Sequence, residues 1–257
     1  MTGNRGGNGG TGSRCGDGIT QPSAEQCDDG NATLCDGCES CELRHYLSLD
    51  GTTGTYIRFD DAPGKPLQLL DSRLTVEGWF RVDADGDIID VKRRGTENTG
   101  WKLLLHKTGV TGTVFGVFDH SLTLAPTGWH HLAWTFDGST STIFVDGHLA
   151  STESHAASIE ATDKPVVIGL STGLDGEITG YTSGKLDEVR VSSVIRYTES
   201  FTPARRHEPD VFTVALWHFD EGEGAAIVDA SDNEHVGHVS GSVRWGTDNG
   251  YDGLFCP

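Results

Sequence analysis

The stretch that decides the fold runs from Gly128 to Ala150 and reads GWHHLAWTFDGSTSTIFVDGHLA. Its first half alternates between two sets of side chains, which is the two-residue period of a β-strand. Asp137-Gly138 then supplies a turn, and the β-branched residues 140–145 form a return strand. A lone hairpin is only marginally stable in water, so this one must belong to a larger sheet. One face of the first strand carries His130, Leu132, Trp134 and Phe136, and the other carries Trp129, His131, Ala133 and Thr135.

Two more stretches agree with this hairpin in order and spacing: LTVEGWF at residues 74–80 and GKLDEVRV at residues 184–191. Together the three stretches resemble the laminin-G-like jelly rolls of the concanavalin A-like lectin/glucanase superfamily. The resemblance covers most of residues 45–245. It implies an all-β chain in which two antiparallel sheets pack as a jelly-roll sandwich. It says less about function, because this fold carries many activities.

The rest of the chain has the strand and turn signals of a sandwich, and no stretch has a sustained helical period. A short helical turn near residues 203–208 stays open. Residues 215–224 and 229–237 resemble the opening of the family's jelly roll, although they stand near the end of this chain. The simplest interpretation is a rearranged strand order, and the alternative is truncation inside a tandem array. Further strands are predicted near residues 46–49, 55–59, 87–91, 101–106, 113–118, 166–168, 185–191, 214–219 and 236–245.

The charge balance bounds the partners. Nineteen basic and 38 acidic residues give a net charge of −19. Such a surface repels phosphate backbones, so we expect no nucleic-acid partner. No apolar run reaches the roughly 20 residues that span a bilayer, so we expect no membrane insertion. The acidity favours metal cations, although it also serves simply to keep a protein soluble.

The cysteines divide the chain into three parts. Residues 1–14 are rich in Gly, Asn, Thr and Ser and are interpreted as a flexible linker, with no apolar core of a signal peptide. Residues 15–44 form a cysteine-rich module with too few apolar residues for a core, and residues 45–257 form the jelly roll. Dense cysteines predict disulfides and therefore a secreted or cell-surface protein. The cysteines are Cys15, Cys27, Cys35, Cys38, Cys41 and Cys256.

The module resembles the Myxococcus-type cysteine-rich repeat and, more loosely, the calcium-binding Notch-type repeat. Relative to the usual repeat, Cys35 is extra. Our hypothesis is that it pairs with Cys256, while the other four cysteines pair within the module. The alternative is a zinc or iron–sulfur site at the Cys35-x-x-Cys38-x-x-Cys41 spacing, with Cys27 as a further zinc ligand.

Calcium is the cofactor that the two resemblances imply. Calcium takes six to eight oxygen ligands, and acidic loops supply them. The alternative is that the same Asp and Asn side chains only form turns. In the jelly roll, the positions that match the family's calcium loop and late strand are Asp187, Asp229, Asp232 and Asn233. In the module, the oxygen donors are Asp17, Asp28, Asp29, Asn31 and Asp36, of which Asp28, Asp29 and Asn31 are the predicted ligands.

Signatures of catalysis are missing. The Glu-x-Asp-x-x-Glu run of the superfamily's glucanases does not occur. His207-Glu208 begins like the helix of a zinc protease, but Pro209 breaks it and Val211 stands where the second histidine belongs. We therefore expect a non-enzymatic protein.

Sugar recognition is the positive hypothesis. Trp79 and Trp129 lie opposite the predicted core side chains of their strands, where each could stack against a sugar ring. The alternative is that both are packed, as tryptophan usually is.

The sequence therefore predicts a secreted, lectin-like binding module with structural calcium, without indicating its oligomeric state. The expected partner is carbohydrate on a cell surface or matrix. The alternative is an adhesion or structural spacer of a larger surface protein, binding another protein. A glycan hydrolase is disfavoured.

Overall fold

The computed structural model describes residues 45–61, 72–82, 88–95, 99–124, 128–172 and 178–247, with the backbone of 38–39 and 42–43. The chain divides into two units, His45–Thr247 and a second made of Met1–Arg44 with Asp248–Pro257. In the second unit, β1 (Cys38–Glu39) pairs antiparallel with β2 (Glu42–Leu43). The predicted disulfides and the calcium donors Asp28, Asp29 and Asn31 lie outside the described residues.

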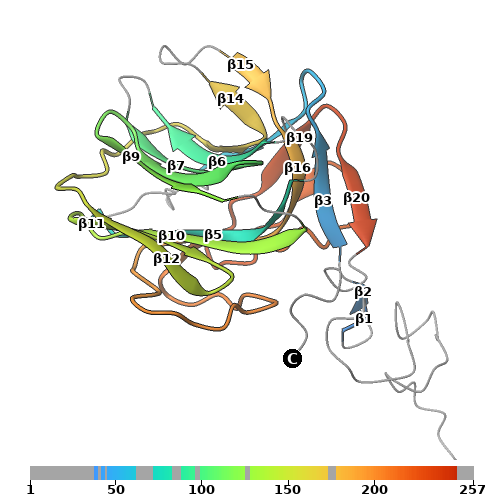
Figure 1. The fold of residues 1–257 in the computed structure, drawn as a ribbon. Coiled ribbons are helices and arrows are strands. Elements are labelled where there is room, and N and C mark those ends of the chain that lie inside the picture. The colour runs from blue at the N-terminus through green and yellow to red at the C-terminus, as the bar shows by residue number, and fades with distance from the viewer. Residues whose placement is uncertain are drawn as a thin grey trace, which may run out of the picture. The chain divides into compact units, whose positions relative to one another are not determined.

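The unit His45–Thr247 is a sandwich of two antiparallel β-layers (Figure 1). In the first layer the strand order is β12-β11-β10-β5-β16. The long strand β16 pairs with β3 along its first half and with β17 along its second, and β20 pairs with β3. The bounds are β3 (His45–Asp50), β5 (Leu74–Arg81), β10 (Trp129–Phe136), β11 (Thr140–Val145), β12 (His148–Ser154), β16 (Ser183–Ser192), β17 (Thr213–Trp217) and β20 (Arg244–Thr247).

In the second layer the order is β9-β8-β7-β6-β13-β4-β19-β18. The layers join where Ser183 of β16 pairs with Ile88 of β6. A separate hairpin consists of β14 (Leu170–Thr172) and β15 (Ile178–Tyr181). The bounds of the layer are β4 (Tyr56–Phe59), β6 (Ile88–Arg94), β7 (Gly100–His106), β8 (Gly109–Val114), β9 (Phe118–Thr123), β13 (Val166–Ile168), β18 (Ala226–Ile227) and β19 (Gly237–Ser240).

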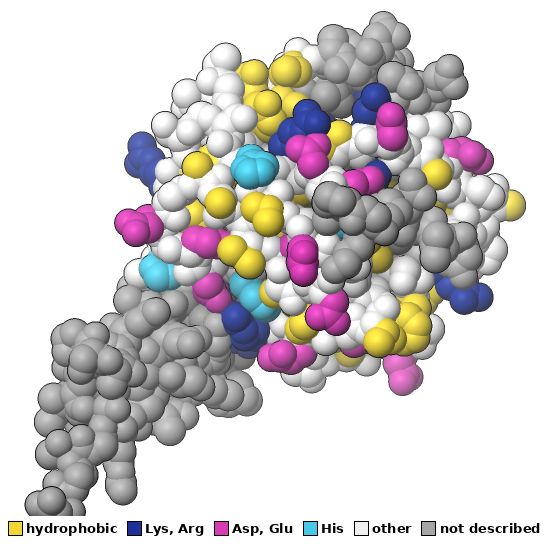
Figure 2. Space-filling view, turned by 180° about the vertical axis from the view of Figure 1, so that it is seen from behind, with side chains coloured by type: hydrophobic (Ala, Val, Ile, Leu, Met, Phe, Trp, Pro, Cys, Tyr) yellow, Lys and Arg dark blue, Asp and Glu magenta, His cyan; other side chains and the backbone are white. Residues whose placement is uncertain are grey.

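This architecture confirms the predicted all-β jelly-roll class, since no helix occurs among the described residues. The part of the chain that the structure describes accordingly contains no helix able to cross a membrane. The C-terminal strands complete both layers, because β17 and β20 join the first layer and β19 joins the second. On one face of the molecule, acidic and basic side chains are interspersed with small groups of hydrophobic side chains (Figure 2).

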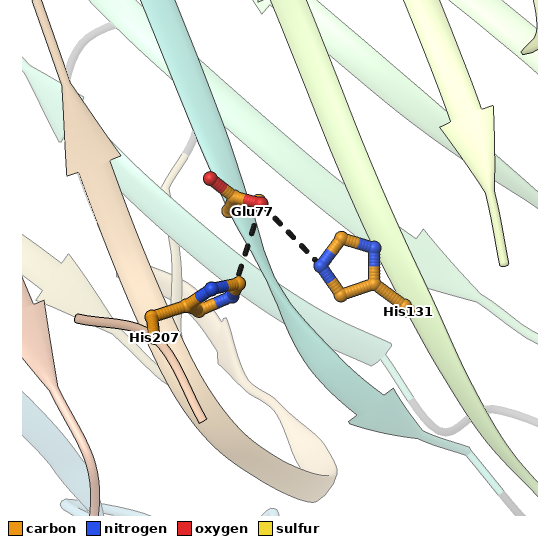
Figure 3. Close-up of side chains that lie close together, drawn as sticks. All are labelled: Glu77, His131 and His207. Carbon is orange, nitrogen blue, oxygen red and sulfur yellow. Dashed lines mark ion pairs between the residues drawn. The ribbon is translucent and has the colours of Figure 1, made fainter. Parts of the chain in front are cut away.

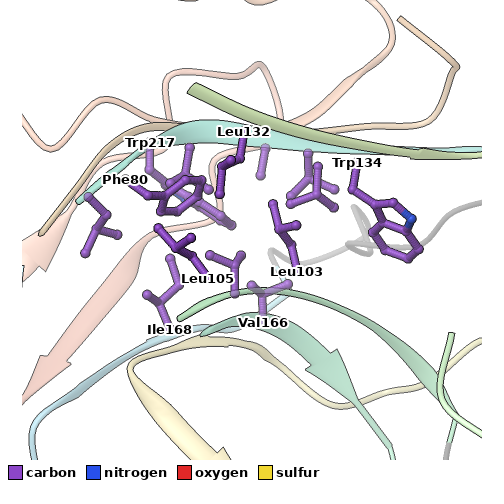
Figure 4. Packing of buried hydrophobic residues seen from close by; sticks show 14 of the residues in the cluster. Phe80, Leu103, Leu105, Leu132, Trp134, Val166, Ile168 and Trp217 are labelled. Atoms are coloured by element: carbon purple, nitrogen blue, oxygen red, sulfur yellow. The ribbon is translucent and has the colours of Figure 1, made fainter. Parts of the chain in front are cut away.

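The core lies between the layers, as the alternation of β10 predicts. Leu132 and Trp134 of β10 and Phe80 of β5 meet apolar side chains of the second layer, among them Leu103 and Val166 (Figure 4). Packing here is so tight that one position opposite Trp134 has room only for glycine. A Cβ at Gly112 of β8 would overlap the Trp134 indole, so glycine lets the two layers approach.

Two sequence expectations are corrected. The strand predicted at 113–118 contains a turn, since β8 ends at Val114 and β9 begins at Phe118. Gly116 permits this turn with φ +76°. No helical turn forms at 203–208, because residues 193–212 run as a long irregular connection between β16 and β17. We call residues 193–212 the covering segment.

The covering segment lies over the outer side of the central strands of the first layer (orange, below β5 and β10 in Figure 1). The Thr75 hydroxyl of β5 donates to the Val194 carbonyl at 2.7 Å, and the Phe201 N–H donates to the Gly147 carbonyl at 2.8 Å. Tyr197 and Phe201 stack with ring centroids 3.5 Å apart. As a result β5 is buried on both faces, and a second interior zone exists beneath this segment.

Candidate functional site

The two tryptophans predicted to be sugar platforms are buried. Trp79 is 1% exposed and Trp129 is 3% exposed. The indole N–H of Trp79 donates to the Ala204 carbonyl in the covering segment at 3.1 Å. The Trp129 ring meets Tyr46 edge-on, with centroids 5.3 Å apart. A stacking platform needs an exposed ring face. Neighbouring residues cover both indole rings, so the prediction that Trp79 and Trp129 are sugar platforms is wrong.

Asp229, predicted as a calcium ligand, organises a turn. Its Oδ1 accepts hydrogen bonds from the backbone N–H groups of Leu216 at 3.0 Å and Ser231 at 2.9 Å. Its Oδ2 accepts from the Ser231 hydroxyl at 2.8 Å and the His235 N–H at 2.9 Å. These bonds match the turn-forming alternative. Calcium at this carboxylate would have to displace some of them, because both oxygens already have donors.

The other predicted calcium ligands of the jelly roll have separate surroundings. The Asn233 amide donates to the carbonyls of Thr213 and Val214, at 3.1 and 3.0 Å. Asp187 is buried and accepts from the Glu188 N–H at 2.8 Å, whereas Asp232 is exposed. Calcium at these residues stays a prediction.

A buried charged cluster on the outer side of β5 is the site that the sequence did not predict. Glu77 is fully buried, with β10 on one side and β16 on the other. Its Oε1 accepts from Arg190 Nε at 2.9 Å and Nη2 at 2.7 Å, and its Oε2 accepts from the Tyr197 hydroxyl at 2.8 Å. Burial raises the pKa of Glu77, but the charges and donors around it outweigh burial and lower that pKa well below 4.5.

Two imidazoles approach the same carboxylate oxygen (Figure 3). His131 Nε2 lies 3.4 Å from Glu77 Oε2, and His207 Nε2 lies 3.8 Å from it. Both rings are buried, and none of their four ring nitrogens has a hydrogen-bond partner. Burial, opposed by the charge of Glu77, lowers the pKa of His207 to about 3, so its ring is neutral at pH 7.

A sequence signal for this cluster exists in retrospect. Glu77 interrupts the mostly apolar run LTVEGWF of its strand, Arg190 stands between Val189 and Val191, and His131 faces away from the core side of its own strand. Register brings Glu77 opposite Arg190 and beside β10. His207 had no such signal, because it comes from the irregular covering segment.

A second candidate surface lies on the outer face of the second layer. Side chains there alternate with the core set, so polar groups from β6, β7, β8 and β9 stand side by side. One row across the strands is Lys92, Lys102, Thr113 and Asp119, and the next is Asp90, Leu104, Thr111 and Ser121. We call the seven polar residues of these two rows the polar grid.

Part of the polar grid is linked internally. The Thr113 hydroxyl donates to Asp119 Oδ1 at 2.6 Å, and the hydroxyls of Thr111 and Ser121 lie 2.9 Å apart. Lys102 lies 5.7 Å from the centroid of the half-buried Phe115 ring at the edge of the grid.

The ion pair of the polar grid is buried. Lys92 donates to Asp90 Oδ2 at 3.1 Å and also to the Leu170 carbonyl. Burial raises the pKa of Asp90 and lowers the pKa of Lys92. The second oxygen of the pair's carboxylate, Asp90 Oδ1, is buried without a hydrogen-bond partner. The grid therefore combines paired charges with one unsatisfied acceptor.

Comparisons with known proteins agree with the fold. Residues 50–200 match the family described as the concanavalin A-like lectin/glucanases superfamily. Residues 11–42 match a domain family of unknown function, DUF4215. A search of curated proteins found no match to this chain.

Two solved structures illustrate the likeness. A Bacteroides ovatus protein, described provisionally as carbohydrate binding, has a TM-score of 0.56 and 18% identity, over 81% of this chain and 61% of its own length. A heptameric pentraxin from Limulus polyphemus has a TM-score of 0.50 and 15% identity, over 83% of this chain and 97% of its own. At such identities the likeness shows the fold alone. Because the family match covers more than half of the sequence, the chain belongs to the concanavalin A-like lectin/glucanase superfamily.

Proposed function

We propose that this chain is a carbohydrate-binding module and that the polar grid is its sugar-binding surface. The observation that carries the proposal is the accessible part of the polar grid, where Asp119 and Ser121 of β9 are exposed and Lys102 of β7 is half-buried near the Phe115 ring. A ligand can reach these three polar groups from solvent. Asp90 Oδ1 is closed to solvent, so it carries no part of the proposal.

The chemistry of the polar grid suits a sugar. Sugar hydroxyls donate and accept hydrogen bonds, and the grid offers a half-buried ammonium donor at Lys102, an exposed carboxylate at Asp119 and an exposed hydroxyl at Ser121. Phe115 adds a partly exposed apolar ring at its edge. Sites for small polar ligands combine a few placed polar groups with aromatic surface in this way. The predicted platforms Trp79 and Trp129 take no part.

Family membership and the provisional description of the Bacteroides ovatus protein support the same class of ligand. We propose that the module acts outside the cell, on a surface or matrix, since its cysteine usage is typical of secreted proteins. Catalysis is not part of the proposal, because both carboxylates of the polar grid are engaged, Asp90 with Lys92 and Asp119 with Thr113, and the Glu77 cluster holds a single carboxylate where glycosidases use two.

The test is a glycan array probed with the full chain, with and without calcium. Lys102→Ala and Asp119→Ala should each weaken binding by about 10- to 100-fold, as expected for a lost hydrogen bond to a charged group. Lys164→Ala is the matched control, because Lys164 is exposed and lies outside the grid. Absence of binding to every glycan class, with capture of a protein ligand instead, would contradict the proposal.

A further inference from the structure

Three ligand atoms of types that hold transition metals converge beneath the covering segment. Glu77 comes from β5, His131 from β10 and His207 from the covering segment, and one side-chain atom of each lies within 4.8 Å of the others. Among the residues that the structure describes, no other group of three His, Cys, Asp or Glu side chains meets this geometry.

The imidazoles are unsatisfied as they stand. A buried polar atom that lacks a hydrogen bond costs about 1–3 kcal/mol, and native proteins leave few of them. His131 and His207 together leave four buried ring nitrogens without partners. His131 Nε2 lies 3.4 Å from Glu77 Oε2 but is poorly aligned for a hydrogen bond. His207 Nε2 lies 3.8 Å from the same oxygen, which is too far for one.

We propose that Glu77, His131 and His207 bind one transition-metal ion, for which zinc is the best match. Zinc takes imidazole nitrogen and carboxylate oxygen at about 2.0–2.2 Å, so neighbouring ligand atoms of a tetrahedral site stand about 3.4 Å apart. The two distances from Glu77 Oε2 lie close to that value. Calcium does not suit this set, because it takes oxygen ligands.

The remaining contacts of Glu77 fit the outer shell of such a site. Arg190 holds Oε1, the oxygen that faces away from the imidazoles, and the Tyr197 hydroxyl donates to Oε2. Outer-shell donors of this kind orient a carboxylate ligand. Binding through Nε2 places the proton of each neutral ring on Nδ1 and satisfies one nitrogen of each histidine.

The site would be structural. Its ligands connect two paired strands of the first layer to the covering segment, which otherwise holds no regular structure. All three ligands are buried, so we expect the metal to enter as the chain folds rather than by exchange with the folded protein. The inference does not depend on the proposed function, because the polar grid lies on the other layer.

The experiment must separate this site from the cysteines. The full chain is produced in medium supplied with Co²⁺, its free thiols are alkylated, and the metal content of the purified protein is measured. We expect about one ion per chain with the visible d–d bands of tetrahedral Co²⁺, and no thiolate-to-cobalt charge-transfer band. X-ray absorption of zinc-loaded protein should show two imidazoles and an oxygen ligand, without sulfur.

Variants locate the ion. The double substitution His131→Gln with His207→Gln should remove at least nine-tenths of the bound metal, whereas the exposed His148→Gln control should keep it. Circular dichroism checks that the double variant is folded. If that variant does not fold, the absorption spectrum of the unmodified chain decides. A chain without metal, a sulfur ligand, or a folded double variant with full metal content would overturn the proposal.

Discussion

Arg190 donates two hydrogen bonds to one oxygen of Glu77, at 2.9 and 2.7 Å, in a zone closed to solvent by the covering segment. The two residues stand directly opposite each other on β16 and β5. The charged pair thus joins the two central strands of the first layer on the side away from the main core. The free energy of this ion pair therefore contributes to the stability of the second interior zone.

Glu77→Gln should lower the free energy of unfolding by roughly 3–5 kcal/mol, because it leaves a buried guanidinium without its counter-charge. Chemical denaturation measures the change. Glu153→Gln serves as the control, since Glu153 is 42% exposed and should matter little. A Glu77→Leu, Arg190→Met double variant should cost less than the two single changes together. Additive costs would contradict a direct pair.

The free energy of unfolding should fall at acidic pH because of His120. This ring is buried between the layers, where it bonds the hydroxyls of Ser141 at 2.7 Å and Ser151 at 2.9 Å. Burial lowers its pKa below 6.5. The unfolded chain therefore takes up a proton first, so the stabilisation is complete above pH 6.5 and is lost as the pH falls below it.

The slope from this single group is at most about 1.4 kcal/mol per pH unit. The free energy of unfolding is measured by chemical denaturation from pH 8 to pH 5, at intervals of about one unit. It should change less steeply with pH for His120→Gln than for the unmodified chain. Equal slopes would show that His120 does not titrate on unfolding.

Gly112→Ala should destabilise the sandwich by about 1–3 kcal/mol, the usual cost of an added methyl group in a well-packed core. The new Cβ would overlap the Trp134 indole, whose N–H donates to Ser141. Thermal unfolding and the near-ultraviolet signal of tryptophan report the change. Gly54→Ala is a useful comparison, because nothing lies within 4 Å of a Cβ there, although its φ of +90° adds backbone strain.

Asp229→Ala should also destabilise the chain, by about 1–3 kcal/mol, because backbone donors of buried residues lose their acceptor. Titration with calcium and with a chelator separates this turn role from the predicted metal role. If calcium does not change the melting temperature and Asp229→Ala lowers it, the role of the aspartate is to form the turn. If calcium raises the melting temperature of the unmodified chain and Asp229→Ala abolishes that rise, the metal role is favoured.

The strands and the jelly-roll class could be predicted because period-two alternation and Asp-Gly turns are local properties. β10 and β11 form where residues 128–150 predict them. The surroundings of Trp79 could not be predicted, because they depend on the covering segment, whose sequence has no helical or strand periodicity. Alternation identified the face of Trp79 correctly, but a residue facing away from one core lies in a second one.

The same limit applies to both candidate sites. Glu77 and His207 are 130 residues apart, as 207 − 77, and they meet only because an irregular connection returns across β5. The polar grid depends on the order β9-β8-β7-β6, and the β8–β9 turn at Phe115–Val117 was not predicted. Asp229 shows the opposite case, since its turn-forming alternative followed directly from its residue type.

Calorimetric titration of the full chain with the strongest glycan from the array is the most direct measurement of the central proposal. The unmodified chain and Lys164→Ala should bind with equal affinity, and Lys102→Ala should bind about 10- to 100-fold more weakly. Equal affinity for all three chains would place the sugar away from the polar grid and contradict the account.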